Sequence, residues 1–446
     1  MPAASNGPDA SASNAADLAA HTRRQVALRL LPLLFVLYIV NYIDRTNVAY
    51  AALEMSHDLG FSDRVFGLGA GIFFVSYVAL QIPGALLIEL WSARRCISGI
   101  LIAWGSLTML TSLVHSAGEL YLARFLLGAA EAAFFPGVVV YLSHWFIRED
   151  RAKAGSAFMA AIPLSFVLGS PLAGWIVGHH WQGVAGWRWL FVLEGVPAIL
   201  LGVVAFFYLT DWPADAGWLA PLRRDWLIEK LRDEKPANPR SATVWEALRS
   251  PAVLLLCGAA FLEYFFAYTV TFWFPTILKR VSGLSDSRVG WLGAVPYVVV
   301  FFAMQLNGWH SDKMCERRWH AALPVMAAAI GLFGLITLPR TTLSVVGLFA
   351  VVCVAQSFLP VLWAMPSEIL CDSAAATAVG LINAVGSVAG FAGPYAFGYL
   401  HTLTGSYRWG FALMALCAVG SAMLLLSTPE TRQNIALNEY GFSPAE

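Results

Sequence analysis

The sequence predicts an all-α membrane protein in which twelve transmembrane helices form two pseudo-symmetric six-helix bundles. Three observations lead to this prediction: an apolar composition, twelve apolar windows of membrane-spanning length, and a repeat that relates the two halves. The 446 residues are 58% hydrophobic and only 13% charged. A soluble domain is about half apolar and about a quarter charged. With 28 Phe and 17 Trp as well, the chain has more apolar surface than one soluble core would bury.

Apolar windows follow one another along almost the whole chain. A transmembrane helix needs about 20 predominantly apolar residues. Windows of this kind cover residues 27–52, 66–90, 96–116, 119–142, 154–178, 187–209, 252–275, 289–309, 320–339, 343–365, 377–401 and 408–428. The long polar interruption at 210–250 separates six windows from six. We therefore expect a disordered cytoplasmic tail at 1–25, an N-terminal bundle at 26–209, a cytoplasmic linker at 210–250, a C-terminal bundle at 251–428 and a cytoplasmic tail at 429–446.

The distribution of basic residues predicts the orientation. If both termini are cytoplasmic, 19 of the 28 lysines and arginines lie in segments on that side and seven lie on the other. An excess of Lys and Arg in cytoplasmic loops is the usual determinant of topology. The first 20 residues lack the basic start and apolar run of a signal peptide. The sequence therefore predicts an N-in, C-in protein of the inner or plasma membrane.

The two halves repeat each other at a nearly constant offset. Pro171, within Gly-Ser-Pro-Leu-Ala-Gly, lies 223 residues before Pro394, within Gly-Pro-Tyr-Ala-Phe-Gly. The same offset of 223 separates Glu89, which precedes an arginine pair, from Asp312, which precedes another. Such duplication is typical of transporters that alternate access around a midplane site. We interpret the small residues around the two prolines as packing seams or hinges between the bundles.

A loop motif in the second half resembles that of a known family. Residues 308–318 read Gly-Trp-His-Ser-Asp-Lys-Met-Cys-Glu-Arg-Arg and resemble the G-x-x-x-D-[RK]…[RK]-[RK] loop of the major facilitator superfamily. The copy at 85–95 keeps an acid and the arginine pair but has Leu90 where a base is usual. In that superfamily the loop latches the two bundles on the cytoplasmic side. The resemblance implies a gating loop made of Glu89, Arg94, Arg95, Asp312, Lys313, Arg317 and Arg318.

Two motifs in the first half look like one branch of that superfamily, the anion:cation symporters. They are residues 41–48, Asn-Tyr-Ile-Asp-Arg-Thr-Asn-Val, and residues 124–137, Arg-Phe-Leu-Leu-Gly-Ala-Ala-Glu-Ala-Ala-Phe-Phe-Pro-Gly. The branch includes bacterial tartrate, phthalate and sugar-acid permeases. The similarity covers almost everything after the N-terminal tail, and the second motif is its most specific part.

Few ionisable residues fall in the middle of the predicted helices. Each costs about 2.5–3.5 kcal/mol at the bilayer centre, so such residues usually have a function. The set consists of Asp44, Arg45, Arg124, Glu131 and Glu263, with Glu194 nearer the outer half of the sixth helix. We interpret Glu263 as a structural, hydrogen-bonded acid. Its aromatic neighbours on the seventh helix supply some aromatic surface, but most are expected to face lipid.

Helical spacing groups the charges of the first and fourth helices. Tyr38, Asn41, Tyr42 and Arg45 form one stripe with Asp44 beside it, and Arg124 and Glu131 share a face. An arginine offers a planar fork that matches a carboxylate, sulfonate or phosphate. A carboxylate in a partly dry cavity resists ionisation, and a nearby arginine favours it. The alternative is that these acids and bases neutralise one another and only hold the bundle together.

The resemblance implies roles for these residues. Asp44 and Glu131 would carry the proton, and Arg45 and Arg124 would handle the substrate anion and couple it to the proton. Further substrate-binding candidates are Asn41, Tyr77, Trp363 and Asn383, although Tyr77 is as well explained by ordinary aromatic packing. Sugar-acid carriers tend to have hydroxyls just before the tryptophan, where this chain has Pro360 and Leu362. This difference favours a smaller or less hydroxylated anion, such as a dicarboxylate, an aromatic acid or a sulfonate.

These observations together predict proton-coupled uptake of a small organic anion by alternating access. The chain has no nucleophile–base set and no metal-ligand spacing, so we expect no enzyme activity, no cofactor and no metal. A net charge of zero gives no reason to expect a nucleic-acid partner, and we expect a monomer in the lipid bilayer. One alternative is an organic-anion exporter or facilitator without proton coupling. Another is a membrane sensor that binds the anion without moving it.

Overall fold

The computed structural model describes residues 8–234, 248–369 and 372–429, and within these ranges the chain is almost entirely helical. The first half contains α1 (Pro8–Asp58), α2 (Asp63–Leu90), α3 (Ala93–Thr111), α4 (Ala117–Glu131), α5 (Phe134–Trp145), α6 (Arg148–Met159), α7 (Ala161–Val177) and α8 (Gly186–Tyr208). A one-turn helix, η1 (Pro213–Asp215), and α9 (Pro221–Asp233) follow. The second half contains α11 (Pro251–Ser282), α12 (Asp286–Met314), α13 (Arg318–Thr337), α14 (Thr342–Cys353), η2 (Val354–Phe358), α15 (Leu359–Ile369), α16 (Asp372–Thr404) and α17 (Tyr407–Leu426).

Each of the twelve predicted windows coincides with a helix or with consecutive helical pieces. Three windows are interrupted: α4 and α5, α6 and α7, and the run of α14, η2 and α15 each make one crossing. Eleven segments among the described residues are long and apolar enough to cross a membrane. The remaining window is α3, whose first turn carries Arg94 and Arg95 and is therefore less apolar. The all-α, polytopic fold class is confirmed.

The N-terminal helix is longer than the sequence suggested. The expected disordered tail at 1–25 is wrong for residues 8–25, which belong to α1. This stretch is rich in alanine, and extending an existing helix is easier than starting one. Thr22 is fully buried, and Arg23 donates to Asp150 at 2.6 and 2.7 Å. The last tail, 430–446, and the linker residues 235–247 lie outside the described residues.

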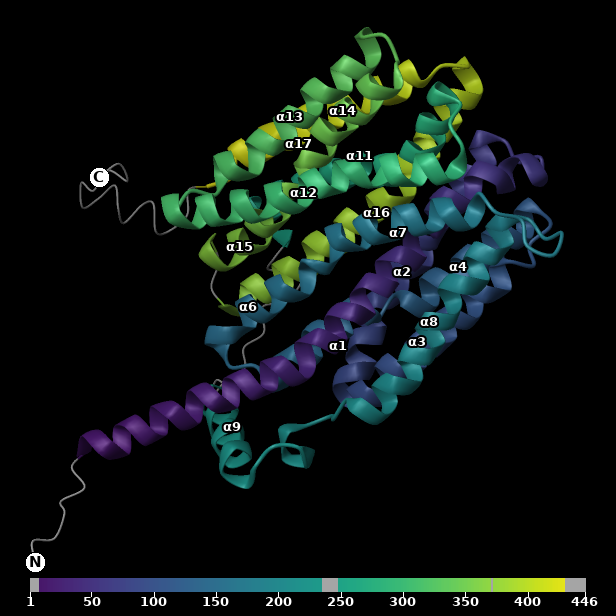
Figure 1. Cartoon of the computed structure of the whole chain (residues 1–446). Helices are drawn as coiled ribbons and strands as arrows, with labels where there is room; N and C mark the ends of the chain where they lie inside the picture. Colours follow the sequence, from purple (N-terminus) through teal and green to yellow (C-terminus); the bar gives the residue numbers. More distant parts are fainter. Residues whose placement is uncertain (1–7, 235–247, 370–371, 430–446) are drawn as a thin grey trace, which may run out of the picture.

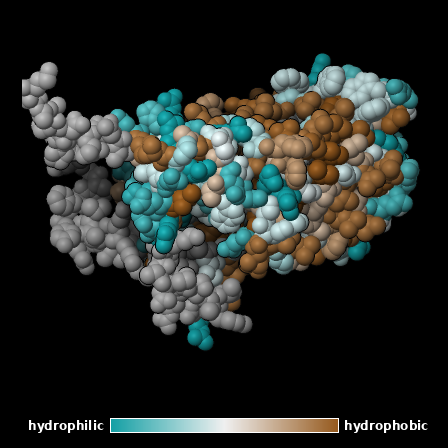
Figure 2. Space-filling model, turned by 90° about the horizontal axis from the view of Figure 1, so that it is seen from below, coloured by the Kyte–Doolittle hydropathy of each residue, from teal (hydrophilic) through white to brown (hydrophobic). Residues whose placement is uncertain are grey.

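Two groups of helices lie side by side in the molecule (Figure 1). The outer side of one group holds α13, α14 and α17, the outer side of the other holds α3, α4 and α8, and α7 and α16 run through the centre. The groups meet where α2 contacts α16, α7 contacts α12 and α1 contacts α11. Figure 2 shows hydrophobic side chains gathered over the flank of the molecule, with hydrophilic ones toward its ends. Leu343, Phe207 and Ile330 are more than two-thirds exposed, as expected for side chains that face lipid.

The two bundles are in close contact at one end, which we call the closed end; it holds the end of α1, the start of α2 and the loop between α11 and α12. A Cβ atom on Gly174 would lie 2.6 Å from the Cα of Gly290. Only glycine permits this approach of α7 to α12. Asp63 of α2 also pairs with Arg280 of α11 at 2.6 Å and with His401 of α16 at 2.6 Å. The predicted packing seam is therefore present at Gly174.

Candidate functional site

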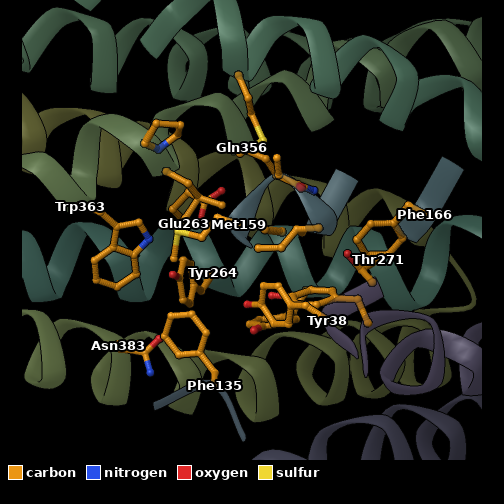
Figure 3. A pocket seen from close by; sticks show the side chains of 18 of the residues that line it. Tyr38, Phe135, Met159, Phe166, Glu263, Tyr264, Thr271, Gln356, Trp363 and Asn383 are labelled. Carbon is orange, nitrogen blue, oxygen red and sulfur yellow. The ribbon is translucent and has the colours of Figure 1, made fainter. Parts of the chain in front are cut away.

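A cavity of about 460 Å³ lies between the two bundles, within the size range of small-molecule sites. It extends to the opposite, open end, where α6 begins and α12 ends, because Ser156, Trp309 and Asp312 are among its walls. Its walls include side chains from α1, α2, α11, α15 and α16, namely Tyr38, Tyr42, Arg45, Thr46, Tyr77, Glu263, Tyr264, Tyr268, Trp363, Asn383 and Ser387. Figure 3 labels Tyr38, Glu263, Tyr264, Trp363 and Asn383 among them. The structure is thus closed at one end and open at the other.

Arg45 is the cationic side chain among the described residues of the cavity wall. Its guanidinium lies 5.1 Å from the ring centre of Tyr42 and 4.9 Å from that of Tyr77. Cations at this distance from aromatic faces are stabilised by the ring quadrupole. Arg45 is only 4% exposed, so its charge lies in a largely desolvated, aromatic wall. This arrangement suits an anion that enters the cavity.

Glu131 lies directly behind Arg45. The Arg45 guanidinium donates to Glu131 Oε2 from Nη2 at 2.9 Å and from Nε at 3.2 Å. Asn41 Nδ2 donates to the same oxygen at 2.9 Å. The other carboxyl oxygen, Oε1, is buried and has no hydrogen-bond partner among the described residues. One oxygen of a fully buried acid thus carries three hydrogen bonds while the other carries none.

Asp44 and Arg124 lie deeper in the N-terminal bundle, away from the cavity. Both are fully buried. Asp44 accepts hydrogen bonds from Asn47 and Thr108, each at 2.8 Å. Arg124 donates only one long bond, to the Gly69 carbonyl at 3.4 Å, and both of its Nη atoms lack partners among the described residues. The predicted proton-coupling and substrate-binding residues are therefore in two layers, with Arg45, Tyr77, Trp363 and Asn383 at the cavity and Asn41, Asp44, Arg124 and Glu131 behind it.

The pairing of charges differs from the alternative suggested by the sequence. Neighbouring acids and bases on one helix do not neutralise each other: Arg45 of α1 pairs with Glu131 of α4, and Asp44 is held by neutral donors. Local spacing places Asp44 beside Arg45 on the same helix. Their side chains nevertheless diverge, because successive residues on a helix point in different directions.

Sequence reasoning missed part of the cavity wall. Glu263 lines the cavity, is 1% exposed, and its Oε1 has no hydrogen-bond partner among the described residues. Tyr264 and Tyr268 of α11 also line the cavity, and Phe266 and Phe272 are buried. The expectation that most of these aromatic residues face lipid is therefore wrong. The missed signal is the spacing of Tyr264 and Tyr268 by four residues, which places both on one face with Glu263 beside them.

The gating-loop residues make contacts within their own halves. Arg317 pairs with Asp312 at 2.6 Å and with Glu368 at 2.7 Å, and Arg318 donates to the Leu426 carbonyl. In the first half, the backbone N–H of Arg94 donates to Asp211 at 2.8 Å. Lys313 lies over the Trp309 ring at 5.3 Å. The Asp312–Arg317 pair therefore does not connect the two bundles, in agreement with a cavity that opens at this end.

Known proteins share both the sequence and the fold of this chain. The family model described as Major Facilitator Superfamily matches residues 34–394 and 256–442. A protein named "Putative tartrate transporter" from Agrobacterium vitis is 40% identical over 93% of this chain and 96% of its own length. "Putative metabolite transport protein NicT" from Pseudomonas putida is 36% identical over 91% and 94% of the two chains. The crystal structure of a D-xylose-proton symporter superposes with a TM-score of 0.71 at 16% identity, over 91% of this chain and 98% of that one.

These similarities extend along almost the entire chain, and the relatives are transporters, so the expectation that the protein is not an enzyme is confirmed. The many apolar helices agree with a multi-pass protein of the inner membrane. The chain belongs to the major facilitator superfamily and is a membrane transporter with the fold of that family.

Proposed function

We propose that this transporter takes up a small organic anion together with protons, with Arg45 as the anchor for the anion and Glu131 as a coupling acid. The observation that carries the proposal is the position of Arg45, which lines the cavity on one side and is bonded to Glu131 on the other. The relative named for tartrate transport supports an organic acid as substrate. The five tyrosines of the cavity wall add hydroxyl groups that hydrogen-bond to carboxylates and hydroxyls.

Glu131 and the substrate anion would compete for the guanidinium of Arg45. Glu131, when ionised, occupies the donors of Arg45, and a carboxylate in the cavity needs the same donors. Protonation of Glu131 weakens its hold on Arg45, so the guanidinium becomes free to bind the anion. Because Oε1 of Glu131 lacks a partner among the described residues, it is the atom that we expect to take the proton. Binding of the anion and of the proton therefore favour each other.

The fold supports alternating access around this site. With Lys and Arg concentrated at the open end, the positive-inside rule assigns that end to the cytoplasm, so the structure corresponds to an inward-open state. Rocking of the bundles would open the seam between Gly174 and Gly290 and close the cavity at Asp312 and Trp309. Uptake of a monovalent anion with one proton moves no net charge, so the pH gradient would drive it. The membrane potential adds about 2.3 kcal/mol per 100 mV only for each proton carried in excess of the charge of the anion.

The remaining predicted residues fit supporting roles. Asn41 holds Glu131 in position. Asn383 of α16 donates to Gln81 of α2 at 3.2 Å and so joins the bundles at the cavity. Trp363 supplies an aromatic wall. Asp44 remains a proposed second proton carrier. Arg124 is proposed to act as a buried positive charge behind the site, because it lies outside the cavity wall.

The test is transport by the purified full-length protein in liposomes with an imposed pH gradient. The substrates offered are tartrate, other dicarboxylates, aromatic carboxylates and a sulfonate. We expect the gradient to drive accumulation of at least one anion. Glu131→Gln should abolish accumulation and retain exchange of the anion across the membrane. Glu119→Gln, which changes an exposed acid on the same helix as Glu131, is the matched control.

Three outcomes would contradict the proposal in different ways. A wild-type carrier whose uptake is indifferent to the pH gradient would favour the facilitator or exporter. Binding of an anion without movement would favour the sensor. Gradient-driven uptake that survives in Glu131→Gln would remove Glu131 from the coupling mechanism while leaving proton coupling itself intact.

A further inference from the structure

Glu194 of α8 is a buried acid that the proposed transport cycle does not use. It is 5% exposed, and neither of its carboxyl oxygens has a hydrogen-bond partner among the described residues. An acid with both oxygens unsatisfied inside a membrane bundle is costly unless a proton or a donor compensates it. Its surroundings therefore need to supply one or the other.

The register of two antiparallel helices places Glu194 at the depth of Asn47. At the closed end, the Trp187 backbone N–H of α8 donates to Glu54 of α1 at 3.0 Å. Seven residues separate Trp187 from Glu194 along α8, and seven separate Glu54 from Asn47 along α1. Because the helices run in opposite directions and rise equally per residue, Glu194 and Asn47 lie at the same level. Both line the same cavity of about 10 Å³.

The other side of Asn47 contacts Asp44. Asn47 Nδ2 donates to Asp44 Oδ1 at 2.8 Å, whereas Asn47 Oδ1 is buried and has no donor among the described residues. A carboxamide donates only from nitrogen and accepts only at oxygen. It can therefore satisfy one ionised carboxylate with its nitrogen, and its oxygen then needs a donor. Glu194 provides that donor only when it is protonated.

One shared proton satisfies the hydrogen bonds of Asn47 in either orientation of its amide. A half-turn of the Asn47 carboxamide exchanges the positions of its oxygen and nitrogen. If the amide is turned over, its nitrogen donates to Glu194, and Asp44 must be protonated to donate to the oxygen. In both arrangements the three side chains are satisfied when Asp44 and Glu194 together hold one proton.

The charges of the surrounding groups also indicate that Asp44 and Glu194 together hold one proton. The neighbours of Asp44 on α3 and α4 are Thr108, Trp104, Arg124 and Glu131. The neighbours of Glu194 across the small cavity are Tyr50 of α1 and Ser170 of α7. Glu131 is neutralised by Arg45. With one proton on the acid pair, the remaining negative charge is balanced by Arg124, which has no ionic partner among the described residues. No proton, or two, would leave one net charge buried in the bundle.

We propose that Asp44 and Glu194 share one proton through Asn47, and that Glu194 is the residue from which Asp44 receives its proton. In the transfer, a water molecule in the shared cavity takes up the proton as the O–H bond at Glu194 breaks, and it gives a proton to Asp44, where an O–H bond forms. The Asn47 amide turns over and keeps both of its N–H bonds, so that its nitrogen then faces the newly ionised Glu194. The cavity that Glu194 and Asn47 share is about the volume of one water molecule, which leaves room for the exchange.

The position of Glu194 gives the transfer a direction. It lies toward the closed end relative to Asp44, two turns along α8 from Trp187. At that end Glu54 pairs with His180 at 2.6 Å, and the His180 side chain is largely exposed. This direction rests on the proposed function, in which the closed end faces outward and protons enter from there. The shared proton itself follows from the hydrogen bonds alone.

The occupancy of the pair is tested by chemical labelling. A hydrophobic carbodiimide modifies carboxyl groups only when they are protonated, and peptide mass spectrometry locates the adduct. In the full-length protein in liposomes at neutral pH, we expect labelling on Glu194 or Asp44 but not on both in the same molecule. Glu194→Gln should leave Asp44 unlabelled, because the new amide supplies the missing donor to Asn47. Absence of label on both acids, or double labelling, would overturn the shared proton.

Transport tests the direction of transfer. Glu194→Gln preserves shape and hydrogen bonding, so it should retain anion exchange but reduce gradient-driven accumulation at least tenfold and shift the pH profile of uptake. Glu119→Gln, an exposed acid on α4, should behave as wild type. Unchanged accumulation in Glu194→Gln would overturn the transfer role. A wild type without gradient-driven uptake would overturn the direction together with the proposed coupling, and the labelling result would still decide the shared proton.

Discussion

Arg45 and Glu131 lie 86 positions apart in the chain and are joined by two hydrogen bonds, at 2.9 and 3.2 Å, at the wall of the central cavity. One member of the pair faces the cavity and the other is enclosed by the N-terminal bundle. The pair therefore connects the space available to a substrate with an acid that substrate cannot reach. Under the proposed function, this arrangement would link anion binding to the protonation of a buried carboxyl group.

Replacement of Arg45 by lysine should weaken anion binding without removing the positive charge. Lysine has no planar fork, so it cannot donate twice to one carboxylate. A hydrogen bond to a charged group contributes about 1.5–3 kcal/mol, so the Kd should rise roughly tenfold to a hundredfold. Substrate titration by calorimetry on the purified protein measures this change. Arg288→Lys, at an exposed position, should leave the Kd unaltered, and an unaltered Kd in Arg45→Lys would exclude Arg45 as the anchor.

Replacement of Gly290 by leucine should prevent the closed end from closing. A Cβ at this position would lie 2.5 Å from the Ser170 carbonyl oxygen and 2.9 Å from the Gly174 Cα, and backbone cannot move aside as a side chain can. The readout is the rate at which an impermeant maleimide modifies Ala173→Cys, a buried position on α7, in a background without other cysteines. We expect faster modification. Gly347→Leu, where the space around the glycine is open, is the control. Equal rates of maleimide modification in the two variants would show that the contact at Gly290 does not hold the closed end together.

Replacement of Asp63 by asparagine should also favour opening of this end, but by less. The carboxylate pairs with Arg280 and His401 of the other bundle. Partly exposed ion pairs contribute up to about 1 kcal/mol, which corresponds to roughly a fivefold change in the ratio of the two states. Maleimide modification of Ala173→Cys should therefore accelerate several-fold, and the effect should shrink at high salt. A rate that is insensitive to both the substitution and the salt would show that these pairs do not stabilise the closed end.

Replacement of Asn383 by leucine should weaken substrate recognition while the carrier remains folded. Asn383 lines the cavity and donates to Gln81 of the other bundle at 3.2 Å. We expect the same amide to hydrogen-bond the bound anion, and loss of one such bond costs about 0.5–1.5 kcal/mol, so KM for anion exchange should rise up to about tenfold. The maximal rate should change less. Thr402→Val is the control on the same helix, because Thr402 bonds only to its own helix at Gly398; an equal KM in both variants would remove Asn383 from the site.

Much of the fold could be predicted from local pattern. Twelve apolar windows became twelve crossings because each is long enough to span a bilayer, and a helix satisfies its own backbone in lipid. The repeat of Pro171 and Pro394 indicated two related bundles, and small residues such as Gly174 do lie where the bundles meet. The tail was the exception, since composition did not reveal that residues 8–25 continue α1.

The site was predicted less completely. Spacing identified the stripe of Tyr38, Tyr42 and Arg45, and all three line the cavity. Spacing also placed Tyr264 and Tyr268 on one face with Glu263 beside them, but it did not show that this face is turned toward the cavity rather than toward lipid. It also placed Arg124 with the substrate-binding residues, whereas the structure has it buried behind them. Helical period fixes which residues share a face, but not which way that face is turned.

The sequence by itself determined the class of the protein, the number and order of its helices, and the small set of charges that a membrane span retains only at a cost. Only the tertiary structure decided that Arg45 bonds to Glu131, that Asp44 is held by neutral donors, and that Asn47 stands level with Glu194. The physical reason is that the depth and rotation of each helix depend on packing against its neighbours. Contacts such as the approach of Gly174 to Gly290 set that packing over more than a hundred residues of chain.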